Sequence, residues 1–497
     1  MLEIAVFLCG AVVMVLELAG SRVLAPFLGT SIVVWTSLIG VVLGALSLGY
    51  WWGGRIADRR PEARLLSRII LLAAVATLLI AGLKGFLLTF LQNKASLSVV
   101  SLSATLVLFA PASLLLGMVS PFAARLRMKD ARSSGRTVGA LYALSTVGSI
   151  AGTFAAGFWL TAAVGTTNLV LLMGGVLIAA AACVYAGDLR AKLAVGALVG
   201  LAAAFLGIYD AQLARAGIFD LDTPYQRVLV YNAHNVETGQ RLRMLATSPE
   251  GSQSAMDPEH PDALVLAYSR YFRLAAHFRP GARRLLLLGG GGGSLPKHVQ
   301  SHPQEFGGMP RLDVVELDPG VTAIAGRHFA FQPKPGVVLH HDDARRFLNA
   351  AQAEPDRYQA VLVDVFTSQL SVPFHLATQE TARAIAGVLD EHGVVLMNCI
   401  SAAEGPKSKF YRALLATYRS VFPRVETFLV QEPNDPASPQ NIILAAFKDG
   451  GEPQLTSANP EYAALLATRY LPPASLPGDP PALTDDFAPV DHYLLGL

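Results

Sequence analysis

Acidic residues and a run of glycines follow a series of apolar segments in the second half of the chain. Gly289 to Gly293 come directly after four leucines, and Glu316, Asp343 and Asp364 stand after the next three apolar segments. Glycine lets the backbone approach a ligand closely, and N–H groups at a helix start can face that ligand. Glu316 comes 27 residues after Gly289, near the place where an acid binds ribose hydroxyls in nucleotide-binding folds.

A single acid at the end of a strand is often only a helix cap. Acids at three successive strand ends, downstream of a glycine loop, instead predict a site for a nucleoside-type cofactor. In that site Asp342 to Ala344 are placed to hold an adenine amino group.

Alternating strands and helices must position these residues. Predicted strands lie at 283–288, 312–317, 336–340, 359–365 and 393–399, and predicted helices at 294–300, 320–328, 343–351, 377–389 and 407–420. This alternation predicts a Rossmann-like α/β domain of class I methyltransferase type with a doubly wound parallel sheet. Ligands of such sheets bind beyond the carboxyl ends of the strands.

Flanking segments complete the predicted soluble part. At 227–231 and 240–246 apolar and polar residues alternate, which is typical of half-exposed strands. Later strand-like stretches at 425–430 and 441–447 are placed to close the sheet. The predicted divisions are a small β-rich lead-in at 215–275, the Rossmann-like domain at 280–450 and a Pro-rich surface tail within 451–497.

Residues 1–210 have the composition of a transmembrane helical bundle. Overall, 52% of the residues are hydrophobic and 15% are charged, and the apolar excess comes from this region. Segments long enough to cross about 30 Å of hydrocarbon lie at 2–20, 32–54, 66–91, 97–120, 137–160, 164–186 and 190–209. The sequence therefore predicts a multi-pass protein of the cell (inner) membrane with about seven spans, surrounded by the lipid bilayer.

Basic residues predict which loops are cytoplasmic. Arginine and lysine gather after the second, fourth and sixth spans, at 55–68, 125–136 and 190–192. By the positive-inside rule these loops are cytoplasmic, and seven crossings from a cytoplasmic N-terminus leave the soluble part outside. A re-entrant or interfacial segment, for which 190–209 is the best candidate, would reverse that result.

The overall charge and the cysteines exclude other classes of protein. A net charge of +2 supplies no basic surface of the kind that binds nucleic acid, so small molecules are the expected partners. Cys9, Cys183 and Cys399 are far apart and form no CxxC pattern. Neither a disulfide framework nor a metal site is therefore expected.

Ordered motifs in residues 215–450 resemble those of the spermidine synthases, the polyamine aminopropyltransferases. The glycine run matches the family's GGGDGG loop, and the other downstream matches are 315–318 to VEID, 342–344 to GDA and 358–364 to YDVIIVD. Upstream, the matching residues are Tyr225-Gln226, Gln253, and Tyr271 with His277. Segments 372–376 and 483–490 resemble the membrane-fused branch of the family, to which the complete chain is similar.

The resemblance implies a reaction of polyamine biosynthesis. The family moves an aminopropyl group from decarboxylated S-adenosylmethionine to an amine such as putrescine and releases methylthioadenosine, without a metal. By resemblance, Asp364 accepts the proton of the amine, Glu316 holds the ribose and Asp343 the adenine. The other implied contacts are Gln226, Gly289, Gly291 and Ala344 to the co-substrate, and Gln253, Tyr271 and Thr367 to the amine substrate.

Three residues depart from the family pattern. Gly292 stands where the family has an Asp that contacts the donor's amine, Thr367 where a second Asp grips the acceptor, and Phe272 replaces a His. Each departure removes a charge or a donor at the reacting end, whereas the nucleoside end is intact. Two alternatives therefore stay open: an S-adenosylmethionine-dependent methyltransferase, and a nucleoside- or polyamine-binding sensor or transporter without turnover.

The resemblance also bears on location and assembly. S-adenosyl compounds are made in the cytoplasm, which favours a cytoplasmic catalytic domain over the outside position that seven spans give. Aminopropyltransferases commonly form dimers, so a homodimer is a further expectation.

Overall fold

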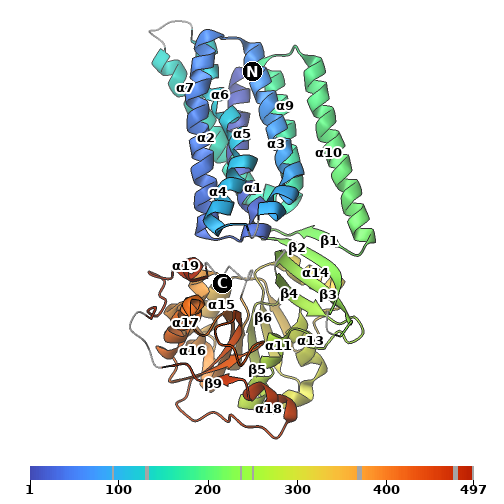
Figure 1. Cartoon of the computed structure of the whole chain (residues 1–497), viewed down its shortest axis with the longest axis vertical. Helices are drawn as coiled ribbons and strands as arrows, with labels where there is room; N and C mark the ends of the chain where they lie inside the picture. The colour runs from blue at the N-terminus through green and yellow to red at the C-terminus, as the bar shows by residue number, and fades with distance from the viewer. Residues whose placement is uncertain are drawn as a thin grey trace. The chain divides into compact units, whose positions relative to one another are not determined.

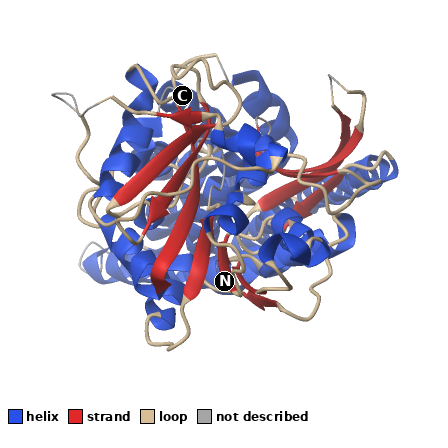
Figure 2. Cartoon of the chain, turned by 90° about the horizontal axis from the view of Figure 1, so that it is seen from below, coloured by secondary structure: helices blue, strands red, loops and turns tan. Residues whose placement is uncertain are grey.

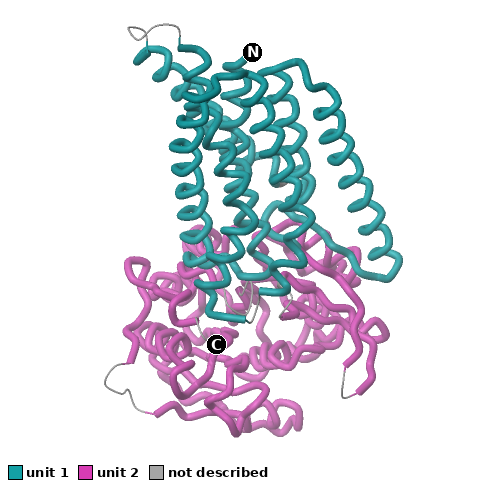
Figure 3. The backbone as a smooth tube through the Cα atoms, turned by 45° about the horizontal axis from the view of Figure 1, so that its top comes forward, with its two compact units in different colours: residues 1–227 teal, residues 228–497 magenta. Residues whose placement is uncertain are grey.

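The chain divides into two compact units, residues 1–227 and 228–497 (Figure 3). The computed structural model describes residues 1–91, 94–128, 134–235, 238–248, 251–365, 372–473 and 479–494. The first unit is built of helices and ends in a short strand, and the second unit is α/β.

The first unit contains long apolar helices. Its elements are α1 (Leu2–Leu28), α2 (Ile32–Arg59), α3 (Ala63–Leu91), α4 (Leu97–Leu108), α5 (Ala110–Gly117), α6 (Val119–Arg127), α7 (Ser134–Ala155), a π-helical turn (Ala156–Leu160), α8 (Thr161–Val164), α9 (Thr166–Val184), α10 (Leu189–Arg215) and β1 (Phe219–Asp222). Among the described residues, six helices are long and apolar enough to cross a membrane. A seventh crossing is added if α4 and the segment Ala110–Arg127, bent by 50°, form one span. The predicted multi-pass character is confirmed.

Local sequence explains the bend and the tight packing in this unit. Pro111 lies in the first turn of α5, where its missing N–H and its ring interrupt the helix. Glycines bring α1 and α7 together, because a Cβ added to Gly148 would lie 2.1 Å from the carbonyl oxygen of Phe7. A small residue is required wherever two helix backbones come this close.

The second unit begins with a small antiparallel sheet, in which β2 (Arg227–His234), β3 (Arg241–Ser248) and β4 (Gly251–Met256) pair in sequence order. This is the predicted β-rich lead-in. Two short helices follow it, α11 (Ala267–Tyr271) and α12 (Leu274–Phe278).

An eight-stranded sheet forms the centre of the second unit, and Figure 2 shows its strands side by side. The strands are β5 (Arg284–Leu288), β6 (Arg311–Val315), β7 (Val337–His340), β8 (Tyr358–Val363), β9 (Leu389–Ser401), β10 (Arg424–Leu429), β11 (Gln440–Phe447) and β12 (Arg469–Tyr470), in the order β12-β10-β11-β9-β8-β5-β6-β7. Strands β5 to β9 are parallel, and the others are antiparallel. The parallel part has a doubly wound order whose switch point lies between β5 and β8, so the predicted fold class is confirmed.

Helices cover both faces of this sheet. They are α13 (Ser294–Ser301), α14 (Pro319–His328), α15 (Ala344–Ala351), α16 (Gln379–Val388), α17 (Lys409–Arg419), α18 (Pro460–Leu466) and α19 (Val490–Leu494), with 3₁₀ turns at Pro303–Phe306, Phe374–Leu376 and Pro406–Ser408. Leu285 and Leu287 belong to one core cluster, and Leu286 and Leu288 to the cluster on the other face. This two-sided burial explains why the strand is a continuous apolar run.

The C-terminal segment contributes more than the predicted surface tail. Strand β12 pairs with β10 at the edge of the sheet, and α18 lies in one core cluster. Leu483, Val490 and Leu494 are buried in the other cluster. Apolar residues spaced between prolines carry these contacts, because the prolines interrupt helices without preventing burial.

Candidate functional site

The glycine loop and Asp364 meet at the switch point between β5 and β8. The N–H of Gly289 donates to the carbonyl oxygen of Val315 (2.9 Å), and the N–H of Asp364 donates to that of Leu288 (2.8 Å). Gly289 has φ 93°, and a Cβ built there would lie 2.0 Å from the carbonyl oxygen of Asp364. Only glycine fits this position, for both conformational and steric reasons.

Replacing Gly289 by Ala is expected to lower the free energy of unfolding by about 3 kcal/mol or more, since strain and a backbone clash add. Gly239→Ala is the matched control, because Gly239 has φ 68° but open space around its Cβ position, so only left-handed strain of about 1–2 kcal/mol applies. Thermal unfolding of the purified chain measures both. Equal losses for the two variants would contradict the predicted clash.

Glu316 follows β6 and holds the glycine loop. Its Oε2 accepts the N–H groups of Gly290 (2.9 Å) and Gly291 (3.1 Å), and its Oε1 accepts the N–H of Asp318 (3.0 Å). Burial raises the pKa of Glu316, while the three N–H donors favour its charged form. A carboxylate has about four acceptor positions, so capacity remains for a ligand hydroxyl.

Asp364 follows β8 and is surrounded by neutral donors. The hydroxyl of Tyr268 donates to its Oδ2 (3.0 Å), and the amide of Asn398 donates to its Oδ1 (3.0 Å). Burial raises the pKa of Asp364, and the two hydrogen bonds only partly oppose this. Burial and the Asp364 charge also raise the pKa of Tyr268 well above its usual value, so Tyr268 remains a donor. The arrangement suits a carboxylate that takes up a proton.

A chain of side-chain amides leads to Asp364 from the neighbouring strands. The Nε2 of Gln431 donates to the Oδ1 of Asn441 (2.7 Å), and the Nδ2 of Asn441 donates to the Oδ1 of Asn398 (2.9 Å). All three donors point in the same direction, so each amide orients the next. The orientation of the Asn398 amide towards Asp364 is thereby determined from the far side of β11.

Asp343 follows β7 and has two tasks. Its Oδ1 caps α15 by accepting the N–H groups of Arg345 (2.9 Å) and Arg346 (3.1 Å), and its Oδ2 lies 3.3 Å from Nε2 of His375. Ala344, the first residue of α15, is buried. Asp343 can therefore cap α15 with Oδ1 and still face a ligand with Oδ2, so the two interpretations of this residue are compatible.

Comparisons with known proteins bear on this arrangement. No family model matches the chain. The chain is 30% identical over 213 residues to the polyamine aminopropyltransferase of Vibrio vulnificus, which covers 42% of this chain and 66% of that protein, just under two thirds. It is 25% identical over 444 residues to polyamine aminopropyltransferase 2 of Ralstonia nicotianae, over 82% of this chain and 80% of that protein. This second match extends into the helical first unit.

The chain is therefore similar to polyamine aminopropyltransferases. The long apolar helices of the described residues and the match over 82% of the chain support the predicted resemblance to the membrane-fused branch. Among solved structures, a probable spermidine synthase from Corynebacterium glutamicum is similar, with 21% identity and a TM-score of 0.39 over 48% of this chain and 83% of that one.

The lead-in sheet meets the glycine loop at Gly292, one of the three positions where the sequence departs from the motif it resembles. The N–H of Gly292 donates to Oγ of Ser254 on β4 (2.9 Å), and a Cβ on Gly292 would lie 2.8 Å from the Cβ of Ser254. The adjacent Gln253 lies near Asp364, because its carbonyl oxygen is 3.4 Å from the Tyr268 hydroxyl, which donates to Asp364. Ser254 thus occupies the space that a side chain at position 292 would need.

The remaining residues that the sequence assigns to the site are Tyr271, Gln226 and Thr367. Tyr271 is 3% exposed and its hydroxyl bonds to Oγ1 of Thr468 (2.9 Å), so it lies in the core and Tyr268 contacts Asp364 instead. Gln226 lies between β1 and β2 at the end of the first unit, where its carbonyl oxygen accepts the N–H of Thr223 (2.8 Å). Thr367 lies outside the described residues.

Segments 372–376 and 483–490, which resemble the membrane-fused branch in sequence, meet beside Asp343. Arg345 donates to the carbonyl oxygen of His375 (3.0 Å) and forms an ion pair with Asp485 (2.9 Å), 140 residues away in sequence. Thr378 also donates to Asp485 (2.7 Å). The C-terminal segment therefore holds His375 in place through Arg345.

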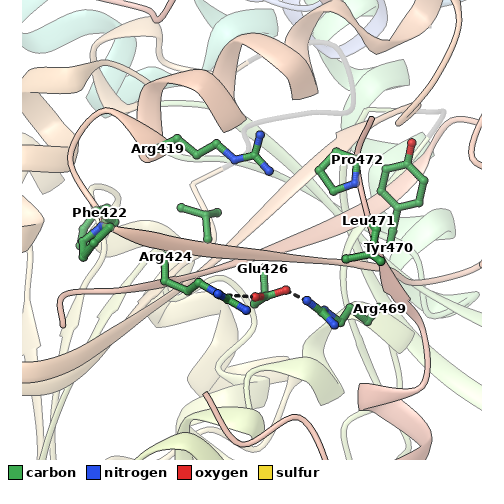
Figure 4. A pocket seen from close by; sticks show the side chains of 10 residues that line it. Arg419, Phe422, Arg424, Glu426, Arg469, Tyr470, Leu471 and Pro472 are labelled. Carbon is green, nitrogen blue, oxygen red and sulfur yellow. Dashed lines mark hydrogen bonds and ion pairs between the residues drawn. The ribbon is translucent and has the colours of Figure 1, made fainter. Parts of the chain in front are cut away.

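A separate cavity of about 420 Å³ lies beside β10 and β12 (Figure 4). Buried Glu426 accepts Nε–H groups of Arg424 and Arg469, both at 2.7 Å. The Arg424 end of β10 pairs with the end of β11 that faces the start of β9. This cavity therefore lies at the sheet edge opposite the strand ends that carry the candidate site. Within the described part of the chain, no group of three or more His, Cys, Asp or Glu residues is placed to hold a metal ion.

Proposed function

We propose that this protein is a membrane-bound transferase that uses decarboxylated S-adenosylmethionine as co-substrate, moves its aminopropyl group to a polyamine or related amine and releases methylthioadenosine. The observation that carries the proposal is Asp364, a carboxylate at the switch point whose neighbours Tyr268 and Asn398 are both neutral donors. The test is incubation of the purified full chain with labelled decarboxylated S-adenosylmethionine and a panel of amines. Release of methylthioadenosine that depends on the amine supports the proposal, and its absence with every amine refutes it.

The proposed nucleoside end uses the glycine loop, Glu316 and Asp343. Gly289 and Gly291 lack side chains where the backbone must approach the ligand, and both have positive φ. Glu316 accepts ribose hydroxyls beside its loop contacts, and Asp343 and Ala344 lie at the strand end proposed for the adenine. His375 is a further proposed neighbour of the adenine, because its Nε2 lies 3.3 Å from Oδ2 of Asp343, the oxygen that does not cap α15.

The proposed reacting end uses Asp364, Tyr268 and Gln253. A neutral amine attacks the carbon beside the sulfonium, so that a C–N bond forms while the C–S bond breaks and its electron pair stays on sulfur. The extra proton of the new ammonium passes to Asp364. Tyr268 and Asn398 hold the carboxylate in one orientation, which keeps the amine in line with the carbon.

An S-adenosylmethionine-dependent methyltransferase is the second candidate. Gly292 favours it, because a donor that carries a carboxylate meets no acid at this position, where Ser254 contributes only a hydroxyl. Product analysis separates the two candidates, since a methyltransferase releases S-adenosylhomocysteine and accepts unmodified S-adenosylmethionine.

Turnover is expected to depend on pH through Asp364. The ionised form is the base, so kcat/KM falls as the pH decreases through its pKa, which burial raises above the usual value. Removing the Tyr268 hydroxyl takes away a donor to the charged form, so Tyr268→Phe shifts this acidic limb to higher pH. Tyr271→Phe is the control, because its hydroxyl bonds to Thr468, and it leaves the limb where it is. A limb unmoved by Tyr268→Phe would contradict the proposed contact.

The same raised pKa has a consequence for stability. An acid that binds its proton more tightly in the folded state favours folding below the unfolded pKa, and this contribution is lost as the pH rises through the folded pKa. Asp364 and Glu316 both have raised pKa values, so their ionisation opposes folding at neutral pH. A bound ligand that donates hydrogen bonds to them is expected to offset part of this cost.

The proposed partners are a small amine, the lipid bilayer and, following the family, a second copy of the chain. Cytoplasmic synthesis of S-adenosyl compounds favours a cytoplasmic position for the α/β unit. The course of the helices within the first unit leads to a different conclusion.

A further inference from the structure

Three ion pairs gather the arginine-rich loops and the N-terminus at one end of the first unit. They join Arg127 to Glu3 (3.2 Å), Arg125 to Asp58 (3.2 Å) and Arg64 to Asp188 (2.8 Å). These residues come from the start of α1, the α2–α3 connection, the end of α6 and the α9–α10 connection. We call this the arginine end.

Contacts between other connections define the opposite end. Arg22, late in α1, donates to the carbonyl oxygen of Thr161 (2.9 Å), which precedes α9. The N–H of Thr166 at the start of α9 donates to Asp222 of β1 (3.0 Å), and Lys84, late in α3, contacts Thr167. Because β1 is where the chain leaves the helices, we call this the exit end.

The bent segment α4–α6 crosses from one end to the other. It follows α3, whose late residue Lys84 lies at the exit end, and it finishes with Arg125 and Arg127 at the arginine end. A re-entrant loop would begin and finish at the same end. The 50° bend at Pro111 is therefore a break within a span.

Helix α10 also crosses, although it packs loosely against the bundle. It begins beside Asp188, which pairs with Arg64 and Arg68 at the arginine end, and it leads to Asp222 at the exit end. Its 27 residues make about 40 Å at about 1.5 Å per residue, more than the hydrocarbon thickness. Figure 1 shows the N-terminus and the start of α10 at one end of the bundle and β1 at the other.

Seven crossings therefore connect the N-terminus to β1, and the two ends differ sharply in charge. The arginine end carries ten basic residues among those described: Arg55, Arg59, Arg60, Arg64, Arg68, Arg125, Arg127, Arg136, Arg190 and Lys192. The exit end of the described helices carries only four: Arg22, Lys84, Lys94 and Arg215. By the positive-inside rule the arginine end faces the cytoplasm. No candidate span lies beyond Arg215 in the described part of the chain.

We infer that the α/β unit lies on the non-cytoplasmic side of the membrane. This location goes beyond the proposed function and requires that the nucleoside donor be present outside the cytoplasm. A nucleoside donor made in the cytoplasm must be carried across the membrane before it can reach Glu316, so a transport step has to supply the site. The amine acceptor must be accessible from outside.

Cysteine labelling of whole cells tests the side. Glu354→Cys places a thiol on an exposed turn of the α/β unit, and Arg60→Cys places one at the arginine end, where the side chain is exposed. With a membrane-impermeant maleimide we expect labelling of Glu354→Cys in intact cells and of Arg60→Cys only after permeabilisation. The unsubstituted chain corrects for its own three cysteines, of which Cys9 and Cys399 are buried.

The reverse pattern of labelling would overturn the inference. An alkaline phosphatase fused after residue 497 checks the result without any substitution in the chain, because that enzyme becomes active only outside the cytoplasm. An active fusion supports the inference, and an inactive one beside a fluorescent cytoplasmic reporter at the same position refutes it. Neither readout depends on turnover, so a failure of the proposed activity would leave this test valid.

Discussion

Asp364→Asn is expected to slow methylthioadenosine release by about 10²–10⁴-fold, the usual contribution of a positioned general base. An amide has nearly the shape of the carboxylate but cannot take up the amine's proton. The amide oxygen of the variant can accept a hydrogen bond either from Tyr268 or from Asn398, whichever it faces. The site is therefore expected to stay folded. Single-turnover rates with the labelled donor and the best amine measure the effect.

Binding distinguishes loss of chemistry from loss of structure in this variant. Calorimetry with methylthioadenosine should give nearly the same Kd for Asp364→Asn as for the unsubstituted chain, because Glu316 and Asp343 are unchanged. Asp356→Asn is the matched control, since this exposed acid precedes the same strand at the opposite edge of the sheet and pairs with Arg284 (3.2 Å). Full turnover by Asp364→Asn would show that Asp364 is not the base and would favour a binding protein or another acceptor of the proton.

Glu316→Gln is expected to weaken methylthioadenosine binding by about 10- to 100-fold, the loss that one or two hydrogen bonds to a charged acceptor would cause. The carboxylate accepts three backbone N–H groups, and an amide has only one acceptor oxygen for them. The glycine loop should therefore loosen as well, at a cost of about 1–3 kcal/mol for each buried donor left unpaired.

Two measurements separate these effects of Glu316→Gln. The midpoint of thermal unfolding reports the loss of loop contacts, and calorimetry well below that midpoint reports the nucleoside. Glu354→Gln serves as control, because Glu354 is exposed in a turn after α15 and neither quantity should change. Unaltered nucleoside affinity in Glu316→Gln would exclude Glu316 from the ribose site while leaving its role in the loop intact.

Much of the α/β unit follows from the sequence alone. Predicted strand 359–365 corresponds to Tyr358–Val363, and predicted helix 320–328 corresponds to Pro319–His328. Strands that are buried on both faces consist of continuous apolar residues, and helices often begin with an acid or a proline. Both features can be recognised in the sequence itself. The acids at the strand ends and the glycine loop were visible for the same reason.

Tertiary structure decided which side chains meet. Tyr268 and Tyr271 are three residues apart on a helix of five residues, too short for periodicity to show which of them faces Asp364. Asn398 and Asn441 meet because the register of β9 and β11 makes them diagonal neighbours, and no local pattern encodes a register. Arg345 of α15 and Asp485 are brought together by the tertiary fold although 140 residues separate them in sequence.

For the helical first unit, too, some features follow from the sequence and others only from the tertiary structure. Hydropathy predicts the membrane-spanning helices, and the basic loops predict which connections are cytoplasmic, because lipid and surface charge act on each segment separately. Whether α10 and the bent α4–α6 segment complete their crossings depended on contacts such as Arg127 with Glu3 and Thr166 with Asp222. The hydrophobicity of a segment reflects its own surroundings and is therefore visible in the sequence. Which distant residues contact each other depends on the path of the whole chain, which only the folded structure shows.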